Sequence, residues 1–483
     1  MKRASELDRT ESRSKPNAAK LGQRVSFGAA NARPQPDLST IAQPSHAADL
    51  VVVPRPDHPI SRANISPQAL KVLYRLRDGG FQAFLVGGAV RDLLLGRSPK
   101  DFDIATDAHP DDVHALFRNS RLIGRRFRLV HVRFGREVIE VATFRGAATA
   151  EESEQASLLD QQGRILRDNV YGRIDEDVWR RDFGANALYY NIEDYSIWDY
   201  VGGLADIEAR RLRLIGDPLK RLREDPVRML RAVRFAAKLD FDIDAPVADI
   251  IPELADLLVN VPAARLFDEF LKLFQSGHAV ASFAALRQAG LFAVLFADTA
   301  RALDGDDDGS YRAFIEAALT NTDNRVQAGQ SVTPMFLLGV FLWGAVRSVA
   351  ADLQTSDALG EGQALSIAAQ QLVLRLTQRV AIPKRFSSPM REMLALQPRF
   401  DRIRGKRAMQ LLGHRRFRAA YDFYVLRAAS GDRGADPEIA EFWTEVQKLP
   451  NDERGARFGV GRGDAAKPPR KRSRRRRRRR AAQ

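Results

Sequence analysis

Two aspartates separated by a single residue are the part of this 483-residue sequence best suited to chemistry. Asp101 and Asp103 stand in the segment SPKDFDIAT, which otherwise reads as a short β-strand. Alternate residues of a strand point to the same face, so the two carboxylates would converge while Phe102 faces the other side. Carboxylates that close repel each other unless a cation lies between them. The pair therefore predicts a metal site, although an exposed strand end with two solvated acids has the same pattern.

A glycine turn precedes this pair. The segment LVGGAVRDLLLG runs from an apolar strand through Gly87 and Gly88 into a short helix. Glycines allow close backbone approach, the N–H groups of a helix start favour phosphate, and Arg91 could add a charge-assisted contact. Mg²⁺ prefers one or two carboxylates together with phosphate oxygens and water. Glycine turn and paired acids together predict a site for a nucleoside triphosphate with Mg²⁺.

Glu140 is a candidate for a third carboxylate. It alternates with Val138 and Ala142 in EVIEVAT, so we expect it on an otherwise apolar strand face, where an unpaired acid is costly. A cation partner is therefore expected, either a metal ion or the basic half of a salt bridge. Asp111 and Asp112 form another acidic pair, but they follow Pro110 in the first turn of a predicted helix, and helix N-terminal stabilisation explains them without function.

The motif EDPVR combines an acid and an arginine three residues apart. Asp225 before Pro226 is typical of a helix N-cap. Arg228 would lie on the same helical face as Asp225, so an acceptor and a donor stand side by side. Adenine and cytosine present the matching donor–acceptor order, whereas guanine and uracil present it reversed and would leave buried polar groups unpaired. The pair predicts acceptance of ATP and CTP and rejection of GTP and UTP.

The composition limits the class of protein. The chain is 45% hydrophobic and has no cysteine, no long apolar run and no secretory signal, so we expect a cytoplasmic protein without a membrane span. The apolar segment at 334–349 is expected to be a buried helix. Of the net charge of +15, ten charges lie in Arg470, Lys471, Arg472 and Arg474 to Arg480. Such a tail is expected to be disordered and to bind polyanions, or to act only as a solubility tail.

Periodicity along the chain predicts an α+β fold, a small mixed sheet followed by a mostly helical region. We expect a helix over 65–80, strands around residues 81–88 and 100–106, a hairpin turning near Gly135, and a strand pair within 186–203. After residue 204 helical patterns dominate. Both termini lack sustained periodicity and are expected to be disordered.

Three blocks in order, LVGGAVRDLLLGRSPKDFDIAT, RRDFGANALYY and EDPVRMLRAVRFAAKL, resemble the motifs of the class II nucleotidyltransferases. These enzymes are the bacterial poly(A) polymerases and the CCA-adding enzymes, and the resemblance runs from about residue 60 to 428. It implies two-metal transfer of AMP from ATP to an RNA 3′ end, with Asp101 and Asp103 holding Mg²⁺ or Mn²⁺. It also implies that Asp182 contacts metal, ribose or an arginine, and that Arg181 binds the nucleotide.

Composition and the resemblance together divide the chain. Composition predicts a disordered extension at 1–60 and a disordered arginine-rich tail at 449–483. The resemblance implies a catalytic domain at 61–203, a nucleotide-recognition neck at 204–300 and an RNA-binding domain at 301–448.

Basic downstream segments favour the poly(A) polymerase branch. LIGRRFRLVHVRFG resembles that branch, and cations among aromatic residues suit an RNA-tracking surface, although a basic helix face looks the same. The candidate RNA-binding residues are Lys384, Arg385, Arg391, Lys406, Arg407, Arg415 and Arg416. Ala89 is more typical of CCA-adding enzymes, and Gly184-Ala185 replaces larger residues, which predicts looser packing there.

Three functions are therefore compared: a template-independent adenylyltransferase of mRNA processing and decay, a CCA-adding enzyme, and a non-catalytic RNA-binding protein. Partners in RNA decay are expected for the first, which is the function the motifs favour.

Overall fold

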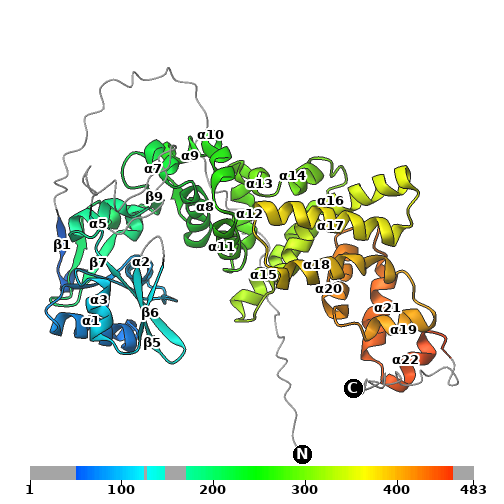
Figure 1. The fold of residues 1–483 in the computed structure, drawn as a ribbon, viewed down its shortest axis with the longest axis horizontal. Helices are drawn as coiled ribbons and strands as arrows, with labels where there is room; N and C mark the ends of the chain where they lie inside the picture. The colour runs from blue at the N-terminus through cyan, green and yellow to red at the C-terminus, as the bar shows by residue number, and fades with distance from the viewer. Residues whose placement is uncertain (1–49, 125–127, 147–169, 461–483) are drawn as a thin grey trace, which may run out of the picture.

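The computed structural model describes residues 50–124, 128–146 and 170–460. A mixed eight-stranded sheet forms one end of an elongated molecule, and helices form the rest (Figure 1). This arrangement confirms the predicted α+β class.

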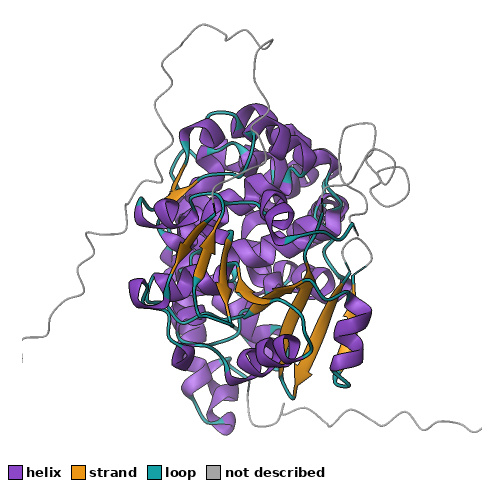
Figure 2. Cartoon of the chain, turned by 90° about the vertical axis from the view of Figure 1, so that its left-hand side faces the viewer, coloured by secondary structure: helices purple, strands orange, loops and turns teal. Residues whose placement is uncertain are grey.

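The strands of the large sheet follow the order β1-β8-β7-β2-β3-β6-β5-β4. β3 and β6 are parallel, and the other neighbours are antiparallel. Figure 2 shows these strands from the side of the sheet domain. The strands are β1 (Val51–Val53), β2 (Ala83–Val86), β3 (Asp103–Thr106), β4 (Ser120–Ile123), β5 (Leu129–Phe134), β6 (Glu137–Thr143), β7 (Leu188–Asn191) and β8 (Ile197–Asp199). A separate parallel pair joins β9 (Arg211–Leu212) to β10 (Asp242–Ile243).

Local sequence signals explain the first helix and the hairpin. The helix α1 (Pro67–Asp78) begins after Ser66, whose hydroxyl accepts hydrogen bonds from the amides of Gln68 and Ala69. The turn between β5 and β6 contains Gly135 at a φ of 63°, a left-handed conformation that glycine adopts without strain. Both predicted elements are confirmed.

Helices cover the two faces of the large sheet unequally. α1 and α3 (Pro110–Leu116) pack on one face, which buries Ile104, Val132, Ile139 and Val141. On the other face, α5 (Ile174–Arg180) supplies Ile174 and Val178 to a core with side chains of β2, β3 and β7. Residues of β4, β5 and β6 on this second face remain largely open. The remaining helical elements of the domain are α2 (Gly88–Leu94), α6 (Gly203–Glu208), η2 (Arg55–Asp57), η3 (Arg62–Asn64) and η4 (Gly184–Asn186).

Apart from the β9–β10 pair, the rest of the described chain is helical, as expected. Its helices are α7 (Pro218–Glu224), α8 (Val227–Leu239), α9 (Ala245–Ala248), α10 (Ile251–Leu254), η5 (Ala255–Asn260), α11 (Ala263–Phe274), α12 (Ala279–Gln288), α13 (Leu291–Leu295), α14 (Ala297–Asp304), α15 (Ser310–Gln327), α16 (Pro334–Asp357), α17 (Glu361–Arg379), α18 (Lys384–Ala395), η6 (Gln397–Arg399), α19 (Gly405–Leu412), α20 (Phe417–Ala429), α21 (Pro437–Lys448) and α22 (Asn451–Arg457).

The apolar helix α16 is packed inside this region. Within the described ranges it is the one helix whose length and composition would suffice to cross a membrane. Of its most apolar stretch, 67% is buried inside the protein. Phe341 contacts the rings of Phe274, Phe283 and Phe296, so the helix acts as a core element.

Two expected boundaries need correction. Residues 51–57 were expected to be disordered, but β1 pairs with β8 and η2 follows it. Short strands such as VVV lack the length that a periodicity argument needs. The expected tail from residue 449 likewise contains α22. The expectations for residues 1–49 and 461–483 lie outside the described residues.

Candidate active site

Asp103 and Glu140 occupy directly opposed positions in the sheet. The parallel register of β3 and β6 pairs Asp103 with Glu140, so both side chains leave the sheet on the same face. Asp101 precedes the first residue of β3, so the alternation argument applies to it only in part. The sheet thus brings together two carboxylates that are far apart in the sequence.

The pKa of Asp103 shows how these acids affect each other. Burial, together with the negative charges of Glu140 and Asp101, raises the pKa of Asp103 to about 6, while Arg181 opposes these effects. A carboxylate that is reluctant to ionise gains most from a bound cation. Within the described part of the chain, no three acidic or histidine side chains already converge at metal-ligand spacing. The oxygen donors and their repulsion nevertheless suit a hard divalent ion.

The expected environment of Glu140 was wrong in one respect. Its neighbours Ile139 and Val141 are the buried residues, whereas Val138, on the same face as Glu140, is 40% exposed. Glu140 therefore lies on the open face of the sheet. Its Oε2 atom lies 3.4 Å from Nε2 of His131 on β5, a partner that no motif of the sequence indicates.

The glycine turn lies beside a cation. Gly87 has a φ of 68°, and a Cβ atom there would lie 3.7 Å from Nη1 of Arg181. Asp177 and Tyr189 hold Arg181 from the other side, with Nη2–Oδ2 and Nε–Oη distances of 2.9 and 2.7 Å. Burial opposes the charge on Arg181, but these two partners outweigh it and raise its pKa. Neither partner was found from the sequence, because their only signal is proximity in the fold.

Arg91 lies behind the glycine turn rather than on its open side. It is 2% exposed, and its Nε and Nη2 atoms donate to Oδ1 of Asp92 at 2.9 and 2.6 Å. Its Nη1 atom donates to the side-chain oxygen of Asn186. The expected direct contact with phosphate stays a prediction; the observed contacts stabilise the turn.

Asp182 is fully engaged with neighbouring groups. Its Oδ2 atom accepts from Nε of Arg231 at 2.7 Å, and its Oδ1 atom accepts from the Phe183 amide at 2.9 Å and from Asn186 at 3.3 Å. Burial would raise its pKa, but Arg231 and these hydrogen bonds lower it to about 2. Of the three contacts expected for this acid, the structure shows the one with a neighbouring arginine.

The backbone near Asp182 is closely packed, contrary to the looser packing expected from Gly184. A Cβ atom on Gly184 would lie 2.2 Å from Oδ2 of Asp206. Asp206 is buried and pairs with Arg213 at 2.9 Å. Glycine is needed here because another chain segment approaches too closely for any side chain.

Asp225 is held by an arginine from a distant helix. Nη1 and Nη2 of Arg265 on α11 lie 3.0 and 2.9 Å from its two carboxylate oxygens. The N-cap interpretation is wrong, because Pro226 occupies the cap position of α8 and no side chain caps it. Arg228 is buried and donates from Nη1 to the Arg221 carbonyl at 2.6 Å and to Glu224 at 3.3 Å. Recognition of a base by Asp225 and Arg228 stays a prediction.

A concentration of positive charge lies beside these residues. Burial and the neighbouring Arg228 lower the pKa of Arg221 to about 10, although Glu224 pairs with both arginines. Arg221 also donates to the carbonyls of Arg180 and Arg181, which ties α7 to the motif that carries Arg181. An anionic ligand would relieve this repulsion.

The candidate RNA-binding residues lie in the other half of the molecule. Figure 1 shows α18, α19 and α20 separated from the sheet by the helices around α8 and α12. Glu392 on α18 pairs with Arg415 and with Arg416, the latter at 3.2 Å, so part of their charge is compensated. The other candidates on α18 and α19 are exposed: Lys384, Arg385, Arg391, Lys406 and Arg407.

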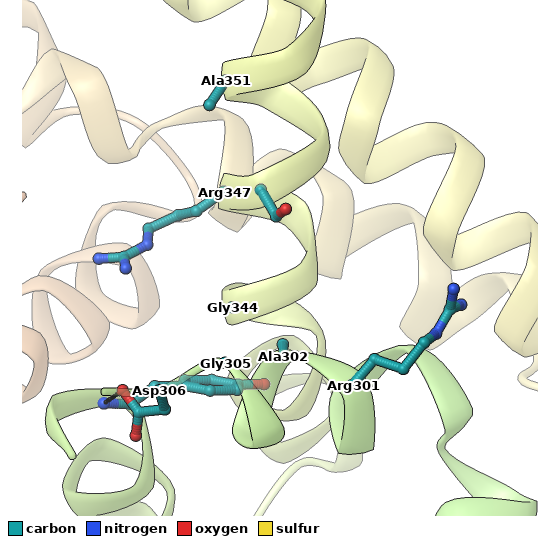
Figure 3. A pocket seen from close by; sticks show the side chains of 9 residues that line it. Arg301, Ala302, Gly305, Asp306, Gly344, Arg347 and Ala351 are labelled. Atoms are coloured by element: carbon teal, nitrogen blue, oxygen red, sulfur yellow. Dashed lines mark hydrogen bonds between the residues drawn. The ribbon is translucent and has the colours of Figure 1, made fainter. Parts of the chain in front are cut away.

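A cavity of about 470 Å³ between α14, α15 and α16 contains none of the predicted site residues (Figure 3). Tyr311 packs against Gly344, where a Cβ atom would lie 2.5 Å from the ring. Arg301 and Arg347 extend to opposite sides in Figure 3, and each pairs with an aspartate. The catalytic candidates therefore do not lie in this cavity.

Three family models match the chain. They are the poly A polymerase head domain at residues 83–213, the probable RNA and SrmB-binding site of polymerase A at 240–303, and the polymerase A arginine-rich C-terminus at 358–480. The crystal structure of Bacillus stearothermophilus CCA-adding enzyme in complex with CTP superposes with a TM-score of 0.52 at 25% identity, covering 81% of this chain and 83% of that one. Together with these matches, the mixed sheet, the glycine turn and the opposed acids Asp103 and Glu140 define the protein as a nucleotidyltransferase.

Sequence comparison separates the branches. Poly(A) polymerase I of Salmonella typhimurium is 46% identical over 408 residues, which cover 84% of this chain and 88% of that protein. The CCA-adding enzyme of Lactobacillus helveticus is 36% identical over 216 residues, 45% of this chain and 52% of that enzyme. The chain belongs to the bacterial poly(A) polymerase family.

Proposed function

We propose that this nucleotidyltransferase adds AMP from ATP to RNA 3′ ends without a template, using the open face of the sheet around Asp103. The observation that carries the assignment is the opposition of Asp103 and Glu140, two acids that form no salt bridge with any arginine of the described ranges. The family relationship supplies the reaction class. Asp103 and Glu140 supply the position where charge must be neutralised.

Asp101, Asp103 and Glu140 would hold Mg²⁺ or Mn²⁺. When bound, such ions lower the pKa of an attacking hydroxyl and neutralise charge on the leaving pyrophosphate. Asp182 is less suited to this role, because its oxygens already accept hydrogen bonds from Arg231, Phe183 and Asn186.

Arg181 is the residue best placed to orient the triphosphate. Asp177 and Tyr189 fix its guanidinium, and its Nη1 atom faces the turn at Gly87. A cation fixed in advance loses little conformational freedom when an anion binds. Gly88 supplies the open backbone, and Arg91 supports the turn from the buried side.

Asp225 and Arg228 would select the base. Arg265 fixes the Asp225 carboxylate, so its oxygens have a defined direction toward a donor on the base. The adenine amino group would donate to Asp225, and ring N1 would accept from Arg228. Guanine would place a carbonyl opposite the carboxylate, which is unfavourable.

The RNA body would lie along the exposed cations of α18 and α19, and the arginine tail would add affinity that depends on salt rather than on sequence. A cytoplasmic location and partners in RNA decay follow from the same proposal.

Incorporation of each nucleotide by the purified full chain tests the proposal. With Mg²⁺ and a generic RNA, long extension with ATP alone is expected. Growth of a few nucleotides restricted to tRNA ends, with CTP required, would instead indicate a CCA-adding enzyme. RNA binding without any incorporation would indicate a binding protein.

A further inference from the structure

Four polar side chains lie in register across four neighbouring strands. The ladder pairs Arg121 on β4 with His131 on β5, His131 with Glu140 on β6, and Glu140 with Asp103 on β3. Directly paired residues point to the same face of a sheet. The row therefore leads from the edge strand to the acid of the candidate active site.

The edge end of this row is strongly basic. The described residues 113–124 and 128–136 contain five arginines and neither aspartate nor glutamate. Arg121 and Arg133 are exposed and make no ion pair with another described residue. The same holds for Arg118 and Arg136, which flank the strands. A surface with this much uncompensated charge attracts a polyanion.

Apolar groups lie beside these cations on the same face. Ile123 lies two residues after Arg121 and is 37% exposed, and Val138 lies two residues before Glu140 and is 40% exposed. A positively charged surface that follows the backbone binds single-stranded nucleic acid without reading its sequence, and the two aliphatic side chains add apolar contact area. We call these six residues of β4–β6 the edge face: Arg121, Ile123, His131, Arg133, Val138 and Glu140.

The distance from Arg121 to Asp103 across the sheet suits the 3′ end of a single-stranded RNA. Neighbouring strands lie about 4.8 Å apart, so β4 is about 14 Å from β3. That distance is bridged by a short extended stretch of single strand whose terminal hydroxyl reaches Asp103. The alternative is a protein partner that adds a strand to β4 by pairing with the backbone groups of β4. Such pairing would not involve the cations on the face of the sheet.

We propose that the edge face binds the last few nucleotides of the RNA, with Arg121 and Arg133 contacting phosphates, and leads the 3′-hydroxyl to Asp103. The inference rests on the proposed function. It adds a second RNA contact surface, in the catalytic domain, to the one predicted on the distant helices. The terminal nucleotides are held there close to the reacting atoms.

The double variant Arg121→Ala/Arg133→Ala tests the proposal, with Lys71→Ala as the matched control. Lys71 is exposed and unpaired on α1, which covers the opposite face of the sheet. The double variant should raise the KM for RNA about tenfold, with the KM for ATP unchanged. The slope of log affinity for a short oligoadenylate against log salt should fall by about 1.4, since each phosphate contact to a single strand contributes about 0.7.

Photocrosslinking supplies a readout that does not depend on substitution. A 4-thiouridine placed a few nucleotides from the 3′ end should crosslink to peptides of β4 and β5. Crosslinks confined to the helices, or a double variant that behaves like Lys71→Ala, would overturn the proposal. Aggregation of the double variant with unchanged RNA binding would also overturn it, because the arginines would then only protect the sheet edge.

These outcomes are distinct from failure of the proposed function. If the unmodified chain does not extend RNA with ATP, the adenylyltransferase proposal fails. If it extends RNA normally and the edge-face variants leave the KM for RNA and the salt slope unchanged, only the edge-face proposal fails.

Discussion

The acids on the open face of the sheet and the acids beside α8 have opposite electrostatic environments. Asp103 faces Glu140, and burial together with neighbouring acids raises its pKa to about 6. Arg231 pairs with Asp182 and lowers the pKa of Asp182 to about 2. Both Nη atoms of the Arg265 guanidinium donate to the Asp225 carboxylate. All three belong to motifs of the same family, yet among the described residues Asp103 has no arginine in salt-bridge contact, whereas Asp182 and Asp225 do.

The difference separates an acid that is available to bind a metal ion, Asp103, from acids that arginines hold in position, Asp182 and Asp225. An acid that already accepts hydrogen bonds from an arginine contributes to the fold and has little left to offer a metal ion. Acids that repel each other lower the stability of the empty site and gain most when a cation arrives. The motif residues therefore have different roles despite similar sequence signals.

The largest expected effect is on catalysis. Asp103→Asn removes one of the opposed carboxylates and should lower AMP incorporation at least about a thousandfold, equivalent to about 4 kcal/mol. A gel shift should show unchanged RNA binding. Asp101→Ala should have a similar effect, and normal incorporation by both variants would refute the metal assignment.

The next largest effect is on stability, and it concerns Asp182. Asp182→Asn breaks a buried ion pair and should lower the free energy of unfolding by about 3 kcal/mol. Because the folded pKa of about 2 lies below the usual 3.8, the stabilisation exists above pH 4 and is lost as the pH falls toward 2. Urea unfolding at pH 7 and pH 3 measures this difference. Asp256→Asn, an exposed and unpaired acid, serves as the control; equal losses in both variants would contradict the account.

A smaller effect is expected on nucleotide selection. Arg265→Ala removes the two hydrogen bonds that hold the Asp225 carboxylate, so the orientation of this carboxylate toward the base is less defined. The preference for ATP over GTP, measured as the ratio of kcat/KM values, should fall about tenfold while the fold persists. If the ratio stays unchanged and only the Tm falls, Arg265 has a purely structural role.

The smallest effect is a gain in stability of the metal-free protein. The raised pKa means that protonated Asp103 stabilises the fold below about pH 4 and that this stabilisation is lost as the pH rises through 6. Asp103→Asn should therefore be more stable than the unmodified chain at pH 8, by up to about 1 kcal/mol after solvent screening. Thermal unfolding in chelator should show this gain vanish below pH 4, and a loss at pH 8 would be inconsistent with repulsion.

Local signals in the sequence predicted the elements but not their partners. Ser66 and Pro67 predict the start of α1, and Gly135 predicts the hairpin turn, because caps and turns depend on residues that are close in the sequence. The strand β1 was missed because three valines are too few to show a period. The expected apolar surroundings of Glu140 were wrong because alternation shows which residues share a face but not which face is buried.

Tertiary contacts of the site could not be predicted by the same means. Arg231 lies 49 residues from Asp182, and Arg265 lies 40 residues from Asp225. Nothing in the spacing of either motif identifies these arginines, since packing of α8 and α11 brings them into place. The motifs located the acids, and only the fold shows which of them remain available to a ligand.

Binding of Mn²⁺ in the presence of ATP shows whether Asp103 or Asp182 holds the metal ion. Electron paramagnetic resonance would measure bound Mn²⁺ for the unmodified chain, Asp103→Asn and Asp182→Asn, with folding checked by circular dichroism. We expect Asp103→Asn to lose bound Mn²⁺ and folded Asp182→Asn to retain it. Retention in Asp103→Asn with loss in folded Asp182→Asn would refute the assignment of the metal site to Asp103.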